Sequence, residues 1–243
     1  MPVALVTGAS KGIGAACAER LAADGFDVAV AYATDHEGAE RTAAAIRGTG
    51  RRAWTTASDA ADAADAARVV AGAERELGPL DAVVANAGLT LDGPAVRMGR
   101  SSWLPPIDVN LGGTFWMLRA ALAGMAQRGT GRAVAMSSVV GLQGNAGQAN
   151  YAASKGGILG LVRTLAREMG PHGVTVNAVA PGFITTRLTD VLSDDHRETL
   201  LQNTALARLG DPQDIAGPVA YLCSPGASYI TGSVLCVDGG LQI

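Results

Sequence analysis

Short, uninterrupted apolar runs recur along the chain, and longer segments of helical periodicity separate them. A strand needs an unbroken apolar run when helices cover both faces of its sheet, which is the environment of a buried parallel strand. The alternation therefore predicts an α/β fold in which helices pack on both faces of one doubly wound, Rossmann-type parallel sheet of about seven strands. The apolar runs are residues 3–6, 28–32, 82–85, 133–136, 174–180 and 234–237.

The chain of 243 residues has no Ser/Pro-rich linker and no break in composition, so we interpret residues 1–243 as a single domain. A net charge of -3 without blocks of like charge argues against nucleic acid and anionic membranes as partners. No apolar segment approaches the length of a membrane span and no signal-peptide pattern precedes the first run, so we expect a cytoplasmic protein. The three cysteines form no CxxC pair, and we expect reduced, packed thiols.

The segment SDAADAADAAR, residues 58–68, spaces its aspartates regularly, a pattern that also suggests a metal site. We favour an Ala-rich helix whose acidic residues lie near its positive end, because alanine stabilises helices and carboxylates favour helix N-termini. We therefore expect no metal ligands in this chain.

The segment VTGASKGIG, residues 6–14, follows the first predicted strand and opens the first predicted helix. Gly8, Gly12 and Gly14 permit a tight turn and close backbone approach, while the helix N-terminus directs free N–H groups at an anion. We interpret this loop as the pyrophosphate cradle of a dinucleotide site. Its spacing is GxxxGxG, which is neither the GxGxxG fingerprint nor a P-loop, because no Gly-Lys-Ser/Thr ending follows.

The same residues contain a second pattern, since Gly8 to Gly12 also spell G-x-S-x-G, the nucleophile elbow of a serine hydrolase with Ser10 as nucleophile. Such an elbow tops a strand in the middle of the sheet, whereas this one follows the first strand of the chain. No earlier segment supplies an N–H group for an oxyanion hole. The hydrolase is kept as an alternative of another class, together with a non-catalytic NADP(H)-binding sensor.

The end of the second predicted strand, Ala31 to Thr34, carries no carboxylate that would bind the 2′-hydroxyl of NAD and repel the 2′-phosphate of NADP. Lys11 places a cation in the nearby loop. We therefore predict a preference for NADP(H) over NAD(H). Asp35 would weaken that preference if its side chain folded back towards the ribose.

Tyr151 and Lys155 lie four residues apart in a chain whose only other lysine is Lys11. On a helix this spacing puts both polar ends on one face. A phenol of pKa about 10 exchanges protons at neutral pH only if its phenolate is stabilised, and an ammonium about 4 Å away supplies roughly 4 kcal/mol in a partly desolvated cleft. We therefore predict a pair that transfers a proton to a carbonyl, with Ser137 or Ser138 orienting that carbonyl.

These motifs together resemble the short-chain dehydrogenase/reductase family over essentially the whole chain. The family's TGxxxGxG motif matches residues 7–14, its NAG motif matches residues 86–88 and its YxxxK motif matches residues 151–155. The family's serine, thirteen residues before the tyrosine, matches Ser138 and not Ser137. The resemblance implies a nicotinamide-dependent oxidoreductase.

The resemblance also implies a role for each matching residue. Tyr151 would be the general acid/base, while Lys155 would bind the nicotinamide ribose and lower the pKa of that tyrosine. Ser138 would position the substrate carbonyl, and Asn110 would hold a water in a proton relay. Together with the glycine loop and the end of the second strand, the expected cofactor contacts are Gly8, Ser10, Lys11, Gly12, Ile13, Gly14, Thr34, Asp59, Asn86, Ala87, Gly88, Tyr151, Lys155, Pro181, Gly182, Ile184 and Thr186.

Within the family, GQANYAASKGG, NAVAPGFI and YITGSVLCVDGG most resemble the 3-oxoacyl-[acyl-carrier-protein] reductases of fatty-acid synthesis. That resemblance implies NADPH-dependent reduction of a 3-oxoacyl thioester, on acyl carrier protein, to the 3-hydroxyacyl product. It also implies a homotetramer built by the long helices around Ser138 and the C-terminal strand and helix. The nearest alternative is a polyketide or small-ketone reductase, and specificity would lie in a substrate loop of about residues 183–209.

Two regions depart from that pattern. Those reductases usually present basic residues near the mouth of the active site for the acidic carrier, where this chain has Arg128 and Arg132 in one region and His172 in the other. Pro105 and Pro106 stand where a helix would run, and proline disfavours helix interiors. We therefore expect a late helix start or a kink near the cleft.

Overall fold

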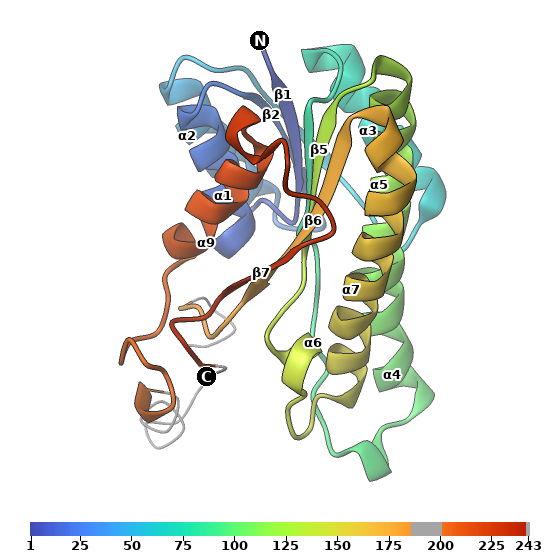
Figure 1. The fold of residues 1–243 in the computed structure, drawn as a ribbon, viewed down its shortest axis with the longest axis vertical. Helices are drawn as coiled ribbons and strands as arrows, with labels where there is room; N and C mark the ends of the chain where they lie inside the picture. The colour runs from blue at the N-terminus through green and yellow to red at the C-terminus, as the bar shows by residue number, and fades with distance from the viewer. Residues whose placement is uncertain (186–200, 242–243) are drawn as a thin grey trace.

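In the computed structural model, which describes residues 1–185 and 201–241, seven strands form one parallel sheet (Figure 1). The predicted doubly wound α/β fold is confirmed. The strand order is β3-β2-β1-β4-β5-β6-β7, so the chain starts inside the sheet, moves outwards to β3, returns to β4 beside β1, and then moves outwards to β7. The strands are β1 (Val3–Thr7), β2 (Asp27–Tyr32), β3 (Ala53–Ala57), β4 (Ala82–Ala85), β5 (Gly131–Met136), β6 (Val174–Pro181) and β7 (Val234–Val237).

Helices cover both faces of the sheet: α1, α2 and α9 pack on one face, and α3, α5 and α7 pack on the other (Figure 1). Within the described ranges, no helix combines the length and the apolar composition that crossing a bilayer needs. The longer helices are α1 (Gly12–Ala23), α2 (His36–Gly48), α3 (Ala63–Leu77), α5 (Gly113–Arg128), α7 (Ala149–Met169) and α9 (Pro212–Cys223). The shorter ones are η1 (Ala95–Arg97), α4 (Arg100–Pro106), η2 (Ile107–Gly112), α6 (Val140–Gln143), η3 (Gly170–His172) and η4 (Pro225–Ala227).

The core consists of two apolar layers that the sheet separates. In β1, Val3 and Leu5 belong to the layer under α3, α5 and α7, while Ala4 and Val6 belong to the layer under α1, α2 and α9. Successive side chains of a strand point to opposite faces, so a strand with an apolar layer on each face has no polar position left. This is why the sequence shows unbroken apolar runs.

The strand that the apolar runs did not identify is β3, at one edge of the sheet. It pairs with β2, and its Trp54 and Thr55 are only half-buried. An edge strand has a neighbour on one side only and tolerates polar residues on its exposed parts. The threonines of β3 therefore gave it no distinct apolar signature.

The Ala-rich segment is helical as predicted, although α3 begins only at Ala63. Asp62 caps the helix by accepting the N–H of Ala64 at 2.8 Å, and Asp65 lies in the first turn. Both carboxylates thus lie at the positive end of the helix dipole. Among residues 1–185 and 201–241, the His, Cys, Asp and Glu side chains form no cluster that could hold a metal ion.

The prolines do not delay the helix that contains them. α4 begins at Arg100 and includes both Pro105 and Pro106, so the expected late start is wrong. The distortion lies after the prolines, where η2 is a π-helical segment that leads directly into α5. Insertions of this kind are frequent at functional sites.

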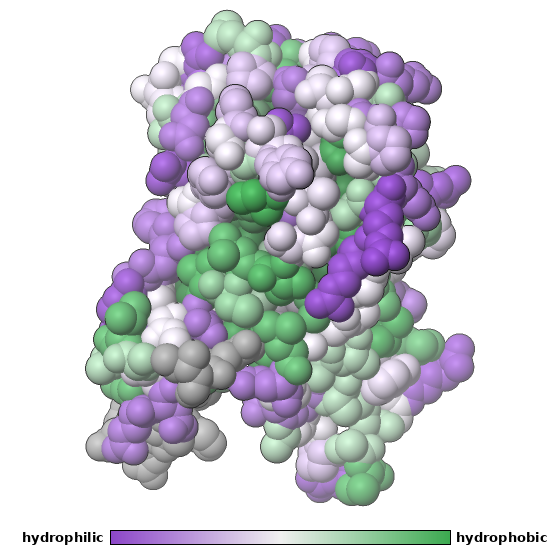
Figure 2. All heavy atoms as spheres, in the orientation of Figure 1, coloured by the Kyte–Doolittle hydropathy of each residue, from purple (hydrophilic) through white to green (hydrophobic). Residues whose placement is uncertain are grey.

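The edge strand β7 is apolar on the outside as well as towards the core. Figure 2 shows an apolar area across the face that β7 occupies in Figure 1, and Leu235 is 38% exposed there. An exposed, apolar sheet edge is a typical site for association with another chain.

The start of β2 is joined to the start of β3 by a buried carboxylate. Asp27 is 1% exposed. Its Oδ1 accepts the backbone N–H of Arg52 at 2.8 Å, and its Oδ2 accepts the Nε–H of the Arg52 side chain at 2.7 Å. Burial alone would raise the pKa of Asp27, but the hydrogen bonds and the charge of Arg52 outweigh it and lower the pKa.

We predict that Asp27→Asn lowers the free energy of unfolding at pH 7 by about 1–3 kcal/mol, because the amide cannot accept both donors of Arg52. The stabilisation by a carboxylate of lowered pKa is present above its unfolded pKa and is lost as the pH falls through the folded pKa. The free energies of unfolding of wild type and Asp27→Asn, measured by urea titration, should therefore converge as the pH is lowered below about 4. Asp24→Asn, at an exposed carboxylate, is the control and should change little.

Candidate functional site

The candidate site lies at the carboxyl edge of the sheet. β1 and β4 are neighbours, but the chain continues from them towards opposite ends of the sheet, so the topological switch point lies between them. Open α/β sheets bind ligands outside the strand ends at such a point. The loops after β1, β4, β5 and β6, with the start of α7, carry most of the predicted site residues.

The glycine loop after β1 has the geometry that a phosphate cradle requires. Gly8 and Gly12 adopt φ angles of 64° and 56°, in the left-handed region that favours glycine. A Cβ added to Gly14 would overlap the carbonyl oxygen of Gly8, so the turn closes only around a glycine. No side chain caps α1, whose first N–H groups are left for an anion. The residues present therefore fit the pyrophosphate of a nicotinamide dinucleotide.

A clasp between β1 and β4 holds the glycine loop and the NAG segment together. The Oγ1 of Thr7 accepts the N–H groups of Asn86 at 2.9 Å and of Ala87 at 3.0 Å. The amide of Asn86 in turn donates to the carbonyl of Thr7 at 3.0 Å and to that of Gly8 at 3.3 Å. Our sequence reasoning did not assign Thr7 a role, although a threonine that ends an otherwise apolar strand is a usable signal.

Of the residues expected near the adenosine end, Thr34 and Asp59 follow the ends of β2 and β3, while Lys11 lies in the glycine loop after β1. Lys11, Thr34 and Asp59 are exposed, and Ser58 joins the two strand ends by donating its N–H to the carbonyl of Tyr32 at 2.7 Å. The carboxylate of Asp35 accepts the N–H of Gly38 at 2.9 Å and caps α2. The side chain of Asp35 is thus engaged by the helix and does not fold back over the end of β2.

Ser10 lies in the glycine turn and is half-buried. β1 is an interior strand of the sheet, so the objection that the elbow does not top a middle strand is wrong. Within the described part of the chain, no hydrogen bond joins the hydroxyl of Ser10 to a histidine or to a carboxylate, so the geometry gives the hydrolase hypothesis no support. A serine nucleophile needs such a base within hydrogen-bonding reach.

Tyr151 lies in the first turn of α7, next to Ser138 at the end of β5. Ser138 is 8% exposed, and its Oγ accepts the N–H of Val140 at 3.2 Å. Burial raises the pKa of Tyr151, the hydrogen bond with Ser138 lowers it, and the carboxylate of Asp92 raises it. The net effect is a raised pKa, opposite to the lowering that we expected, so the phenol is protonated at neutral pH.

Lys155 follows one turn later and is 4% exposed. Its Nζ donates to the carbonyl of Met136 at 2.7 Å and lies 5.7 Å from the centroid of the Tyr151 ring. Burial lowers the pKa of Lys155 to about 8. The ammonium of Lys155 is therefore directed at a carbonyl of β5. A Cβ added to Gly88 would lie 3.4 Å from the Nζ of Lys155, so the NAG segment covers the ammonium.

The two serines that end β5 have different partners. The Oγ of Ser137 donates to the carbonyl of Lys155 at 2.8 Å and so fixes α7 against β5. A Cβ on Gly141 would lie only 2.7 Å from the same carbonyl carbon, which brings α6 into close contact with α7. Ser138 is the serine whose hydroxyl is next to the phenol of Tyr151.

Asn110 lies in the π-helical segment η2 and is completely buried. Its Nδ2 donates to the carbonyl of Leu89 at 2.9 Å and to the Oγ of Ser154 at 3.0 Å, and its Oδ1 accepts the N–H of Leu89 at 2.8 Å. The Oγ of Ser154 donates to the carbonyl of Tyr151 at 2.8 Å. Asn110 therefore connects the loop after the NAG segment to the turn of α7 that carries Tyr151.

The predicted nicotinamide loop begins at Pro181, the last residue of β6. The N–H of Gly182 donates to the carbonyl of Val237 at 3.0 Å, and a Cβ there would lie 2.7 Å from the Cα of Asp238. Ile184 is 6% exposed. Thr186 lies outside the described residues, as does much of the predicted substrate loop.

The basic residues expected at the mouth of the site lie elsewhere within this chain. Arg128 ends α5 just before β5 begins, whereas Ser138 follows the end of β5, so the two lie at opposite edges of the sheet. Arg128 is paired with Glu74 at 3.3 Å and donates to the carbonyl of Leu80. Arg132 is the second residue of β5, and His172 ends η3 just before β6 begins. Arg128, Arg132 and His172 therefore lie away from the mouth of this chain's own site.

The edge of the sheet thus combines a phosphate cradle with a protonated phenol and a neighbouring hydroxyl. Two such donors, Tyr151 and Ser138, can hold one carbonyl oxygen between them. That arrangement suits delivery of a proton to an oxygen atom that is gaining negative charge.

Comparison with known proteins agrees with this site. Residues 8–242 match the family described as Enoyl-(Acyl carrier protein) reductase. The 3-oxoacyl-[acyl-carrier-protein] reductase FabG of Staphylococcus aureus is 44% identical over 240 residues, which cover 99% of this chain and 98% of that protein. The reductase of the same name from Salmonella typhimurium is 44% identical over 241 residues, which cover 99% and 97%.

A solved structure is similar over the whole chain. The crystal structure of a protein described as a short-chain alcohol dehydrogenase from Sinorhizobium meliloti superposes with a TM-score of 0.95 at 39% identity. The match covers 99% of this chain and 96% of that one.

We predict that Lys155→Met makes the protein more stable at pH 7, by up to about 3 kcal/mol, because burial of the ammonium opposes folding. Between about pH 8 and 10.5, Lys155 keeps its proton in the unfolded chain but has lost it in the folded chain. The free energy of unfolding of the wild type therefore rises as the pH increases through that window. The advantage of the variant should shrink accordingly in urea titrations at pH 7 and 10. Lys11→Met at the exposed lysine is the control, and a variant less stable than wild type at pH 7 would contradict the interpretation.

Proposed function

The chain belongs to the short-chain dehydrogenase/reductase family, and from that premise we propose that it reduces 3-oxoacyl thioesters to 3-hydroxyacyl thioesters with NADPH. The observation that carries the proposal is the hydroxyl of Ser138 beside the protonated phenol of Tyr151, next to a phosphate cradle. The names of the FabG relatives support the substrate class.

The bound nicotinamide supplies the hydride that the carbonyl carbon receives. Ser138 donates a hydrogen bond to the carbonyl oxygen and orients it, and Tyr151 transfers its phenolic proton to that oxygen. The carbonyl becomes a secondary alcohol and the thioester is unchanged. Tyr151 is protonated at neutral pH, so the proton that the oxygen needs is in place before the hydride arrives.

For the cofactor we propose the contacts expected from the sequence, with NADP(H) preferred. No carboxylate lies within the end of β2 itself, and that of Asp35, in the turn beyond, is bonded to the start of α2. Lys11 is exposed at the start of α1 and is available to that phosphate. The family membership itself supports a nicotinamide cofactor of either kind.

For assembly and partners we propose a homotetramer that accepts substrates on acyl carrier protein. The exposed apolar edge at β7 supports self-association, which light scattering of the purified chain tests. Arg128 lies too far from the site of its own chain to dock a carrier protein there. In a tetramer, Arg128 of a second copy of the chain would have to lie next to that site.

Two other reactions remain as comparisons for the assay. The matched family carries the description of an enoyl reductase, which acts on a carbon–carbon double bond. The pairing of Ser138 and Tyr151 favours a carbonyl oxygen instead, because both groups donate hydrogen bonds to oxygen. A polyketide or small-ketone reductase uses the same chemistry and differs only in substrate, while a sensor would bind NADPH without turnover.

We predict that Tyr151→Phe lowers kcat/KM for acetoacetyl-carrier protein about 10²- to 10⁴-fold and leaves the Kd of NADPH nearly unchanged. NADPH oxidation is measured with acetoacetyl-carrier protein, acetoacetyl-CoA and crotonyl-CoA in parallel. Tyr229→Phe, at a fully exposed phenol, is the control and should behave as wild type. Turnover of crotonyl-CoA alone, or near-normal activity of Tyr151→Phe, would contradict the proposal.

We predict that Lys11→Gln raises the KM for NADPH about tenfold, since one charge-assisted bond to a phosphate is worth about 1.4 kcal/mol or more. The KM for NADH should change less than twofold, because NADH has no 2′-phosphate. An equal effect on both cofactors would place Lys11 at the shared pyrophosphate instead.

A further inference from the structure

Pro106 leaves a backbone carbonyl without its usual helical donor. In α4 the carbonyl of Ser102 would accept the N–H of residue 106, but proline has no N–H group. A buried or half-buried carbonyl needs another partner. The structure supplies one from a different helix.

That partner is the side chain of Asn150, which is completely buried one residue before Tyr151. Its Nδ2 donates to the carbonyl of Ser102 at 2.7 Å and to the carbonyl of Leu91 at 2.8 Å. Its Oδ1 accepts the N–H of Tyr151 at 2.7 Å, in the first turn of α7, where the helix itself provides no acceptor. One amide therefore joins α4, the loop after the NAG segment and the backbone of Tyr151.

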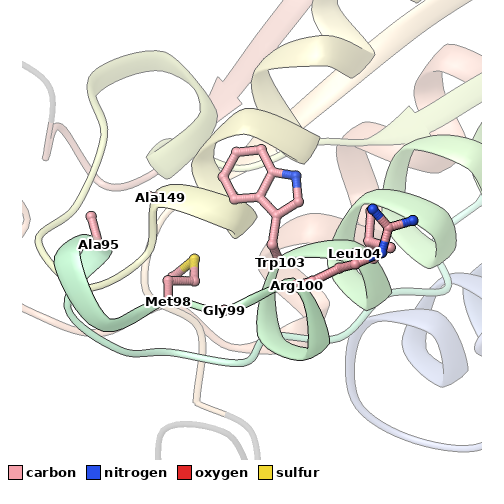
Figure 3. A pocket seen from close by; sticks show the side chains of 7 residues that line it. All are labelled: Ala95, Met98, Gly99, Arg100, Trp103, Leu104 and Ala149. Carbon is pink, nitrogen blue, oxygen red and sulfur yellow. The ribbon is translucent and has the colours of Figure 1, made fainter.

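α4 and the start of α7 border a common pocket. The pocket has a volume of about 430 Å³ (Figure 3). Trp103 and Leu104 of α4 and Ala149 of α7 are among its lining residues, with Met98 from the preceding loop. Asn150 bonds across the same junction, from α7 to the carbonyl of Ser102 in α4.

We propose that Asn150 is a positioning residue, which fixes the first turn of α7 and thereby the distance between the phenol of Tyr151 and the hydroxyl of Ser138. The proposal rests on the proposed reduction for its kinetic consequence, but not for its structural one. Asn110 anchors the same turn through Ser154 and the carbonyl of Tyr151, so the tyrosine is held from both of its backbone groups. An asparagine suits the place because two carbonyls require two donors and the N–H requires an acceptor.

The kinetic test uses Asn150→Ala, Pro106→Ala and the double variant. Asn150→Ala should lower kcat for acetoacetyl-carrier protein about 10- to 100-fold while the Kd of NADPH stays within twofold. Pro106→Ala should stay within threefold of wild type. The double variant should keep the low kcat of Asn150→Ala, because an N–H group at residue 106 satisfies the carbonyl of Ser102 within α4 but neither links α4 to α7 nor gives the N–H of Tyr151 an acceptor. Unchanged kcat in Asn150→Ala, or recovery of kcat to the wild-type value in the double variant, overturns the proposal.

The structural test does not depend on activity. Hydrogen–deuterium exchange at the amide of Tyr151 should accelerate at least tenfold in Asn150→Ala and should not change in Asn145→Ala. Asn145 is an exposed asparagine of the loop just before α7, whose amide donates to the side chain of Gln148 at 2.9 Å, and is the matched control. Equal protection in all three proteins overturns the proposal, even if wild type reduces no 3-oxoacyl thioester and the proposed function fails.

Asn150→Ser is the second variant, for the case in which Asn150→Ala does not fold. A serine keeps one donor and one acceptor, so its kcat and its exchange rate at Tyr151 should lie between those of wild type and the alanine variant. Values equal to wild type in both measurements overturn the proposal.

Discussion

The parallel direction of all seven strands is the constraint on which the site depends. It brings the carboxyl ends of β1, β4 and β5 to one edge, so that Thr7, Asn86 and Ser138 lie along that edge although they are far apart in sequence. The hydroxyl of Thr7 then fixes the loop after β4 relative to the end of β1, because it accepts two N–H groups from that loop. The apolar core thus determines where the reacting groups lie, and a few polar contacts at its rim determine how they are oriented.

Most of the fold was predictable from apolar runs, because a strand such as residues 3–6 faces an apolar layer on each side. The edge strand β3 was not predictable in this way, because half-buried threonines such as Thr55 interrupt its apolar run, whereas the other edge strand, β7, is apolar throughout. Pro106 was also misjudged, since local propensity disfavours a helix there. The helix is instead supported by Asn150, 48 residues away from the carbonyl that it binds.

The identities of the proposed site residues followed from motif spacing, but their electrostatics did not. Spacing alone suggested that Lys155 acts on the phenol of Tyr151. In the structure the ammonium donates to the carbonyl of Met136 and lies 5.7 Å from the centroid of the Tyr151 ring, and burial raises the pKa of the tyrosine. The direction of a lysine and the solvation of a phenol depend on groups that the fold brings together, which no local pattern records.

The π-helical segment η2 makes the number of residues between α4 and α5 important for the geometry of the site. An α-helix turns about 100° for each residue, so removal of one residue between Ile107 and Gly112 would restore regular helix and rotate α4 against α5 by about that angle. Asn110 could then no longer face Leu89 and Ser154 at the same time, even though every side chain had been retained. Related chains that keep this site should therefore differ by substitution in the segment and not by insertion or deletion.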